Sequence, residues 1–377
     1  MRGVRGVASL LVLAVASSCV GERQTSEPPR LRATIDLRIG EENESREEYI
    51  FGFVDGLAFG DDGRILVADA KDNTVRVFSA IGQHLYTIGR QGQGPGDLSG
   101  PCCLLFASNG LLWIKENGNH RYSSFRLGET SATFVGSVRG TTNYVVRPDR
   151  VDFDARGRLI DLALAYMPAR NALGIVRLRL DSSGTVAERD TVPTPPADSL
   201  STVSFASGGG TATYSQPYGA ESLHAFGAGG EAAHGVSSRY AVAWMDASGK
   251  LRTLAQRDVG AGPALSDKER AATVKELETI AAQARVPRSE LPLEVPNRKS
   301  PLVAIGFDLE GRLWIERSVT DGQPGEADVY DRQGRWSAVF QWPRAVSMRF
   351  WTVHGLTGLG IEEGADGAQR VVRLHFR

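Results

Sequence analysis

Glycine turns recur at a constant spacing along this chain, and this spacing restricts the fold more than any other feature of the sequence. Gly63, Gly110 and Gly157 are 47 residues apart, and each precedes a short apolar run such as Leu111–Ile114. A second set of turn glycines separates two further strand-like runs: Gly82, Gly128, Gly184, Gly249 and Gly334. Glycine reaches the positive φ of tight hairpin turns without steric cost. The repeat therefore predicts units of four short strands with a period of roughly 40–50 residues, the pattern of a β-propeller.

Six such units can be placed along the chain, near 51–90, 100–138, 149–192, 216–259, 301–343 and 347–377. The last unit has only three strand-like runs, whereas segment 31–39 is a strand-like run outside any unit. Because a fourth strand would cover the open edge of the last sheet, we expect segment 31–39 to pair there. The predicted fold is all-β. It is a six-bladed β-propeller of four-stranded blades over 31–377, with the N-terminal strand closing the last blade and one helical insertion.

Two stretches in the first units resemble the NHL repeat. Its core reads Asp, small, Gly, Asn, any, Arg, aliphatic and then an aromatic. Segment 116–125 (ENGNHRYSSF) and segment 69–78 (DAKDNTVRVF) resemble this core, and segment 92–98 (GQGPGDL) is similar to the linker between blades. Glu116 stands where the family usually has Asp, and Thr74 where it usually has Arg. The later units look more like bacterial six-bladed propeller lipoproteins related to NHL proteins. The resemblance implies a propeller fold, which does not by itself imply a function.

The N-terminus has the pattern of an export signal. Arg2 and Arg5 precede an apolar run at 7–16, and small residues then lead to Cys19. The run is too short to span a bilayer as a stable helix. The segment resembles a bacterial lipoprotein signal, which implies a signal peptide at 1–18, a lipid on Cys19 and a tether at 19–30. The protein is then exported and membrane-anchored, on the periplasmic or outer-membrane face. Ala16 departs from the usual lipobox, so a soluble secreted or periplasmic form is the alternative.

Two segments break the repeat, at about 193–216 and 261–300. The first contains Pro193, Pro195, Pro196 and a run of three glycines at 208–210, and is expected to be an irregular loop. In the second, Ser266 and Glu269 form a capping box. The helix that follows should bury one face and end at Pro287; the residues expected on that face are Val274, Leu277, Ala281 and Ala284. Both insertions should lie on one face of the propeller, where long loops on a rigid scaffold usually bind ligands.

The candidate binding residues lie in the expected rim loops and in the second insertion: Glu116, His120, Arg121, Tyr166, Tyr218 and Arg298. For Glu116, His120 and Arg121, the alternative is that they only join neighbouring loops through salt bridges. The rigid repeat scaffold, the two insertions on one face and the lack of a catalytic motif favour a non-catalytic binding or scaffold module at the cell envelope, with a protein, peptide or glycan partner and no cofactor. A nucleic-acid partner is not expected, since the chain has 43 basic and 44 acidic residues and therefore no excess of positive charge.

The alternative is a metal-dependent hydrolase or lyase. Lactonase-like enzymes with six blades hold an axial Ca²⁺ or Zn²⁺ with oxygen ligands, and Asp55 before Gly56 resembles one element of such a site. Matching Asn and Asp motifs are not found in the later units.

The adjacent Cys102 and Cys103 should point to opposite faces of a strand as small buried side chains.

Overall fold

The computed structural model describes residues 27–40, 46–140, 153–154, 156–167, 172–192, 200–207, 210–364 and 367–377. The signal segment 1–18 and Cys19 therefore lie outside the described residues. Within those ranges the chain is all-β, with a single α-helix, α1 (Asp267–Ala284), and short 3-10 turns at Glu47–Tyr49 and Arg288–Glu290. No helix in this part of the chain is both long and apolar enough to cross a membrane.

Most strands form antiparallel sheets of neighbours in sequence. Sheet I contains β2 (Val54–Phe59), β3 (Ile65–Asp69), β4 (Thr74–Phe78) and β5 (His84–Ile88). Sheet II contains β6 (Pro101–Phe106), β7 (Leu112–Glu116), β8 (Arg121–Leu127) and β9 (Ala132–Arg139). Sheet III contains β10 (Leu159–Met167), β11 (Ala172–Leu180) and β12 (Val186–Thr191). Sheet IV contains β15 (Ser222–Phe226), β16 (Ala232–Val236), β17 (Ala241–Met245) and β18 (Leu251–Gln256).

The remaining sheets are joined to each other. Sheet V contains β19 (Leu302–Phe307), β20 (Leu313–Arg317), β21 (Gly325–Tyr330) and β22 (Trp336–Trp342). Sheet VI contains β23 (Val346–His354), β24 (Thr357–Glu363), β25 (Gln369–Phe376) and β1 (Arg30–Ile39). β1 runs antiparallel to β25, as expected for segment 31–39, and its first residues also pair in parallel with β22. β1 therefore joins sheets V and VI into one eight-stranded sheet.

Five of the glycine turns share one local hydrogen-bond pattern. In five turns an aspartate carboxylate accepts the backbone N–H groups two and four residues later, and a glycine three residues later has a φ of 71° to 83°. The aspartates are Asp154, Asp181, Asp246, Asp308 and Asp331. A residue with a Cβ is strained at such a φ, so the sequence Asp-x-x-Gly specifies each turn without help from distant parts of the chain.

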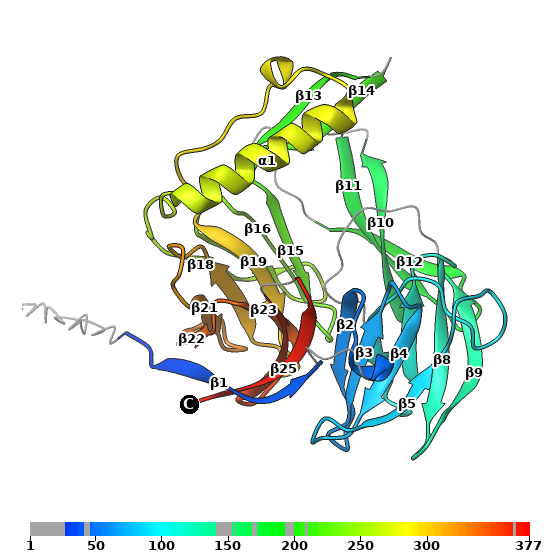
Figure 1. Cartoon of the computed structure of the whole chain (residues 1–377). Coiled ribbons are helices and arrows are strands. Elements are labelled where there is room, and N and C mark those ends of the chain that lie inside the picture. The colour runs from blue at the N-terminus through cyan, green and yellow to red at the C-terminus, as the bar shows by residue number, and fades with distance from the viewer. Residues whose placement is uncertain are drawn as a thin grey trace, which may run out of the picture.

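Successive sheets pack against each other through apolar clusters. β2 of sheet I contacts both β6 of sheet II and β23 of sheet VI. One cluster joins sheets II and III through Tyr122 and Leu178, and another joins sheets IV and V through Trp244 and Phe307. These contacts give the sheets the propeller-like arrangement seen in Figure 1.

The first insertion is a β-hairpin, so the expected irregular loop at 193–216 is wrong over its second half. β13 (Thr202–Ser207) pairs with β14 (Gly210–Ser215). Val203, Phe205 and Tyr214 lie on the face that packs against α1. Alternation of apolar and polar residues favours a strand with one buried face, and here this signal outweighs the glycine run at 208–210.

The helix is present with its capping box, but its expected face and end need correction. Thr273 is buried and Val274 is 41% exposed. These two positions flank the face formed by Leu277, Ala281 and Ala284 on opposite sides, and the helix buries the side of Thr273. The helix ends at Ala284, where Arg285 adopts a left-handed φ of 57°, before Pro287 is reached.

A third correction concerns Tyr166, which lies in strand β10 opposite Leu173 and not in a rim loop.

Cys102 and Cys103 do not point to opposite faces as expected. The pairing of β6 with β7 shifts register between Pro101 and Leu104, and the two sulfur atoms lie 2.8 Å apart. A β-bulge places two residues opposite one and turns a side chain away from its usual direction.

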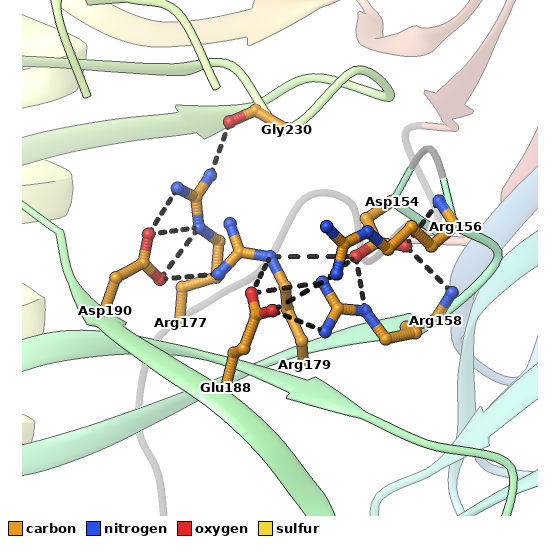
Figure 2. A network of polar contacts seen from close by, with 8 residues as sticks. All are labelled: Asp154, Arg156, Arg158, Arg177, Arg179, Glu188, Asp190 and Gly230. Atoms are coloured by element: carbon orange, nitrogen blue, oxygen red, sulfur yellow. Dashed lines mark hydrogen bonds and ion pairs between the residues drawn. The ribbon is translucent and has the colours of Figure 1, made fainter. Parts of the chain in front are cut away.

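A network of arginines and carboxylates links sheet III to sheet IV (Figure 2). Arg177 pairs with Asp190 at 2.6 Å and also donates to the carbonyl of Gly230 in the first turn of sheet IV. Arg158 bridges Asp154 and Glu188 at 2.7 and 2.8 Å. Burial alone raises the pKa of Asp190, but the hydrogen bonds and charges of Arg177 and Arg179 outweigh it and hold that pKa below its ordinary value.

We expect this network to make the protein less stable in acid. A carboxyl whose pKa is lower in the folded state contributes stability above its unfolded pKa of about 3.9, and this stability is lost as the pH falls through the folded value. Urea unfolding at pH 6 and pH 3 should show a clear loss, and Arg177→Met should make that loss smaller. Arg126→Met, at an exposed position of β8, is the control. Equal pH dependence in all three proteins would contradict the assignment.

Candidate functional site

The two insertions pack together beside the sheets, as Figure 1 shows for α1, β13 and β14. Leu277 and Ala281 of the helix form an apolar cluster with Leu291 and Leu293, and the hairpin's apolar face covers it. The side chain of Gln216, after β14, donates to the carbonyl of Glu294 and accepts its N–H at 3.1 Å. The two insertions therefore pack into one unit. This agrees with the expectation that both lie on the same face.

Polar contacts at the start of α1 hold this body against sheet V. The Ser266 hydroxyl accepts the Glu269 N–H at 3.2 Å and donates to Asp321 at 2.9 Å. Lys299 forms a buried ion pair with Glu269 and donates to the carbonyl of Val319 at 2.9 Å. Asp321 and Val319 both lie between β20 and β21, so the helix N-terminus is fixed to that loop.

A pocket of about 350 Å³ lies where the insertion meets sheets IV and V, and we call it the insertion pocket. Its lining combines three kinds of polar group with two aromatic rings. The carboxylates are Glu221, Glu269 and Glu316, and the cations are Lys299, Arg317 and Arg344. The hydroxyls are Ser237, Ser300 and Ser318, and the rings are Tyr218 and Trp342. The six charged side chains sum to zero, so the pocket offers donors and acceptors without favouring either sign of charge.

Three groups in the pocket are placed to contact a ligand. Arg344 is half-exposed and lies 3.8 Å from Glu269 and 3.7 Å from Asp321, beyond hydrogen-bonding distance of both. Burial raises the pKa of Glu269, but Lys299 and the Ser266 N–H outweigh it and hold the pKa below its ordinary value, so the carboxylate is charged. Burial, and then the charges of Glu269 and Glu276, raise the pKa of Tyr218, so its hydroxyl stays protonated.

Tyr218 is held in an uncommon conformation. Its φ is 53°, in the left-handed region that residues with a Cβ rarely adopt. Its carbonyl accepts both the N–H and the hydroxyl of Ser300 at 3.1 Å, and the residue as a whole is 39% exposed. Strained residues of this kind cluster at ligand-binding positions.

The predicted cluster of Glu116, His120 and Arg121 lies elsewhere, in sheet II. Glu116 is fully buried and accepts hydrogen bonds from Arg121 at 2.8 Å and Asn119 at 2.6 Å. Arg121 also donates to carbonyls of Gln93, Gly94 and Asp97 in the linker between sheets I and II. His120 adopts a φ of 49° beside them. These contacts join the linker to sheet II, the structural role given above as the alternative.

The other predicted residues fall in different places. Arg298 donates to the carbonyl of Gly262 at 2.8 Å and pairs with Ala264, which closes the base of the second insertion. Asp55 lies in β2. Among the residues that the structure describes, no group of three or more His, Cys, Asp or Glu side chains is placed to hold a metal ion. Tyr218 lines the insertion pocket, whereas the other predicted binding residues with described side chains do not.

No family model and no curated protein matches the chain. Among solved structures, the chain is similar to a candidate exported protein from Bacteroides fragilis, with 9% identity over 92% of this chain and 95% of that one and a TM-score of 0.47. It is also similar to a PQQ-bound aldose sugar dehydrogenase from Streptomyces coelicolor, with 12% identity, 93% and 100% coverage and a TM-score of 0.44.

A third similar structure is virginiamycin B lyase from Staphylococcus aureus, with 9% identity, 92% and 99% coverage and a TM-score of 0.38. All three TM-scores are below 0.5. We therefore base the propeller-like arrangement on the strand pairing and sheet contacts of this chain, and transfer no activity from these proteins.

Proposed function

We propose that this protein is a non-catalytic binding module of the cell envelope. Its insertion face takes a protein, peptide or glycan partner, and the insertion pocket recognises a polar segment of that partner. The observation that carries this proposal is the pocket's balanced set of carboxylates, cations and hydroxyls beside Tyr218. Such a lining pairs with neutral polar groups, such as sugar hydroxyls or peptide amides, and also with a zwitterion.

The size of the pocket limits what it can hold. Ligand sites usually have volumes of about 300–1,000 Å³, and 350 Å³ lies at the lower end of that range. The pocket therefore has room for one sugar ring or one amino-acid residue. The rest of a larger partner would lie on the neighbouring surface of α1 and the hairpin.

We also propose the finer features of the fold and of the anchor. Six blades of the NHL-related type are the proposed arrangement, with sheets V and VI as separate blades bridged by β1. Strand contacts between sheets I and II, IV and V, V and VI, and VI and I support it, together with the apolar cluster between sheets II and III and the hydrogen bond from Arg177 to Gly230 between sheets III and IV. A lipid on Cys19 would leave residues 19–29 as a tether before β1, one residue shorter than expected because β1 begins at Arg30. Fully extended, these 11 residues span at most about 40 Å, so the propeller would stay close to the membrane. Mass spectrometry of the mature N-terminus tests this, since an unmodified Cys19 would exclude the lipid.

Binding to glycan and peptide arrays, followed by titration calorimetry with the best ligand, tests the proposed function. Tyr218→Asn should weaken binding at least about tenfold, because asparagine tolerates the left-handed φ but removes the ring and its hydroxyl. Arg344→Ala should have a similar effect through loss of donors. His120→Asn is the matched control, since His120 has nearly the same φ and lies in sheet II.

Equal binding by Tyr218→Asn, Arg344→Ala and the unmodified protein would contradict the role of the pocket. Stoichiometric Ca²⁺ or Zn²⁺ in the purified protein, together with a hydrolysis or elimination that chelators abolish, would instead support the metal-dependent alternative near Asp55.

A further inference from the structure

The two adjacent cysteines meet at an irregularity of β6. Pro101 pairs with Glu116 and Leu104 pairs with Ile114, so Cys102 and Cys103 together face only Lys115 on β7. This is the two-against-one count of a β-bulge, which bends the strand and re-aims its side chains. In a regular strand the two thiols would point apart. Here the sulfur atoms lie 2.8 Å apart.

Strand β2 of the adjacent sheet I leaves space for this bulge at a single glycine, Gly56. A Cβ at Gly56 of β2 would lie 2.7 Å from the carbonyl oxygen of Cys102, closer than real Cβ atoms come to such an oxygen. The pairing of β2 with β3 also shifts register between Val54 and Gly56. Two irregularities therefore face each other, and a larger residue at 56 would displace the backbone that brings the thiols together.

The two thiols differ in how easily a reagent can reach them. Cys102 is 4% exposed, whereas Cys103 is half-buried beside Trp113 and Phe153. The hydrogen bond with Cys103, together with burial, raises the pKa of Cys102 well above its ordinary value. An external reagent therefore meets Cys103 first, and Cys102 lies behind it within reach of the same sulfur.

We propose that Cys102 and Cys103 are a redox site that forms a disulfide between adjacent residues by exchange with a disulfide-donating oxidant. The Cys103 thiolate attacks one sulfur of the donor, R–S–S–R, forms a mixed disulfide and releases one R–S⁻. Cys102 then loses its proton and attacks the Cys103 sulfur, releasing the second R–S⁻. Two protons from the protein convert the two leaving groups to two R–SH. The two cysteines are oxidised by two electrons and the donor is reduced by two.

This disulfide would change the oxidation state of the two thiols at the bulge, but as a cross-link it would add little to the stability of the fold. In the loop-entropy account, the stabilisation from a disulfide grows with the length of chain that it closes. A link between neighbours closes the shortest possible loop. Oxidation should therefore protect both thiols from alkylation while leaving the unfolding midpoint of the protein nearly unchanged.

The test incubates the full chain with mixtures of reduced and oxidised glutathione, followed by acid quenching, alkylation in denaturant and trypsin digestion. The peptide Gln91–Lys115 contains both cysteines and excludes Cys19. We expect it to become about 2 Da lighter than the dithiol form and to resist alkylation until it is reduced. A peptide that keeps two alkylatable thiols, holds glutathione on both sulfurs or links to a second copy would overturn the proposal.

Two kinds of variant test the order of events and the role of the bulge. Cys102→Ser should trap the glutathione adduct on Cys103, whereas Cys103→Ser should react at least about tenfold more slowly. Gly56→Ala should shift the equilibrium towards the dithiol by about tenfold in the glutathione ratio. Gly136→Ala is its control, because a Cβ at Gly136 meets nothing within 4 Å. Equal adduct rates for the two serine variants, or equal equilibria for the two alanine variants, would count against the mechanism.

Discussion

Replacing Glu116 with alanine is expected to lower the free energy of unfolding by about 3–5 kcal/mol, the usual cost of breaking a buried ion pair on one side. Glu116 is fully buried. It accepts hydrogen bonds from the Arg121 guanidinium, the Asn119 amide, the Ser123 hydroxyl and the Ser99 N–H. Alanine would leave the partly buried Arg121 guanidinium with backbone carbonyls but no charged partner, and it would remove an acceptor from the other three donors. Urea unfolding followed by tryptophan fluorescence measures the loss.

Two further variants show whether the loss comes from this network. Glu116→Gln keeps the size of the side chain and one acceptor oxygen but removes the charge, so we expect an intermediate loss. Glu363→Ala, at an exposed position of β24, should change the midpoint little. A Glu116→Ala protein as stable as Glu363→Ala would mean that Arg121 and the linker find other partners at no cost.

Replacing Trp314 with alanine is expected to cost about 3–5 kcal/mol through a cavity, a different mechanism. The Trp314 ring is fully buried, with ring centroids 4.5 Å from Phe340, 5.3 Å from Phe350 and 6.0 Å from Phe376. These rings belong to sheets V and VI, so the cavity would open at the junction of the two sheets. The indole N–H also donates to Asp308 at 2.8 Å, and the truncation would leave that buried carboxylate with one donor fewer.

The location of this effect can be measured as well as its size. Leu31, Ala33 and Ile35 of β1 pack on the same cluster, so hydrogen exchange should become faster in β1 and β25 of the Trp314→Ala protein. Trp351→Ala, at a half-buried position of β23, is the control for loss of an indole ring. Unchanged exchange in β1 would show that the cluster does not hold that strand in place.

The strand pattern could be predicted from the sequence because its signal is local. Each Asp-x-x-Gly turn is satisfied by hydrogen bonds within five residues, so Asp246 with Gly249 and Asp331 with Gly334 specify their turns alone. The hairpin at 202–215 was missed because the glycine run outweighed a short alternation of apolar residues. An alternating strand buries its apolar face only if another element packs against that face. Here the packing element is α1, which lies more than 50 residues later in the sequence.

The insertion pocket could not be predicted because its residues come together only through the fold. Glu269 was recognised for its capping role, and nothing in the sequence indicates that its carboxylate also pairs with Lys299 and faces Arg344. The sequence does not distinguish Arg298 from its neighbour Lys299, yet Lys299 lines the pocket while Arg298 donates to the carbonyl of Gly262. The bulge at Cys102 and Cys103 was equally hidden, since register depends on the partner strand and on the space left at Gly56.

The pairing of β1 with β25 has a consequence for the order in which the protein is made. Ala33 lies opposite Phe376, so one of the first strands to leave the ribosome pairs with the last. Sheet VI therefore cannot be completed until β25 has been synthesised or, in a chain that crosses a membrane unfolded, until β25 has crossed. Until that moment β1 lacks its antiparallel partner, and only its first residues can pair with β22. The arrival of β25 thus sets the time at which this sheet closes, and in a chain exported before it folds that step takes place on the far side of the membrane.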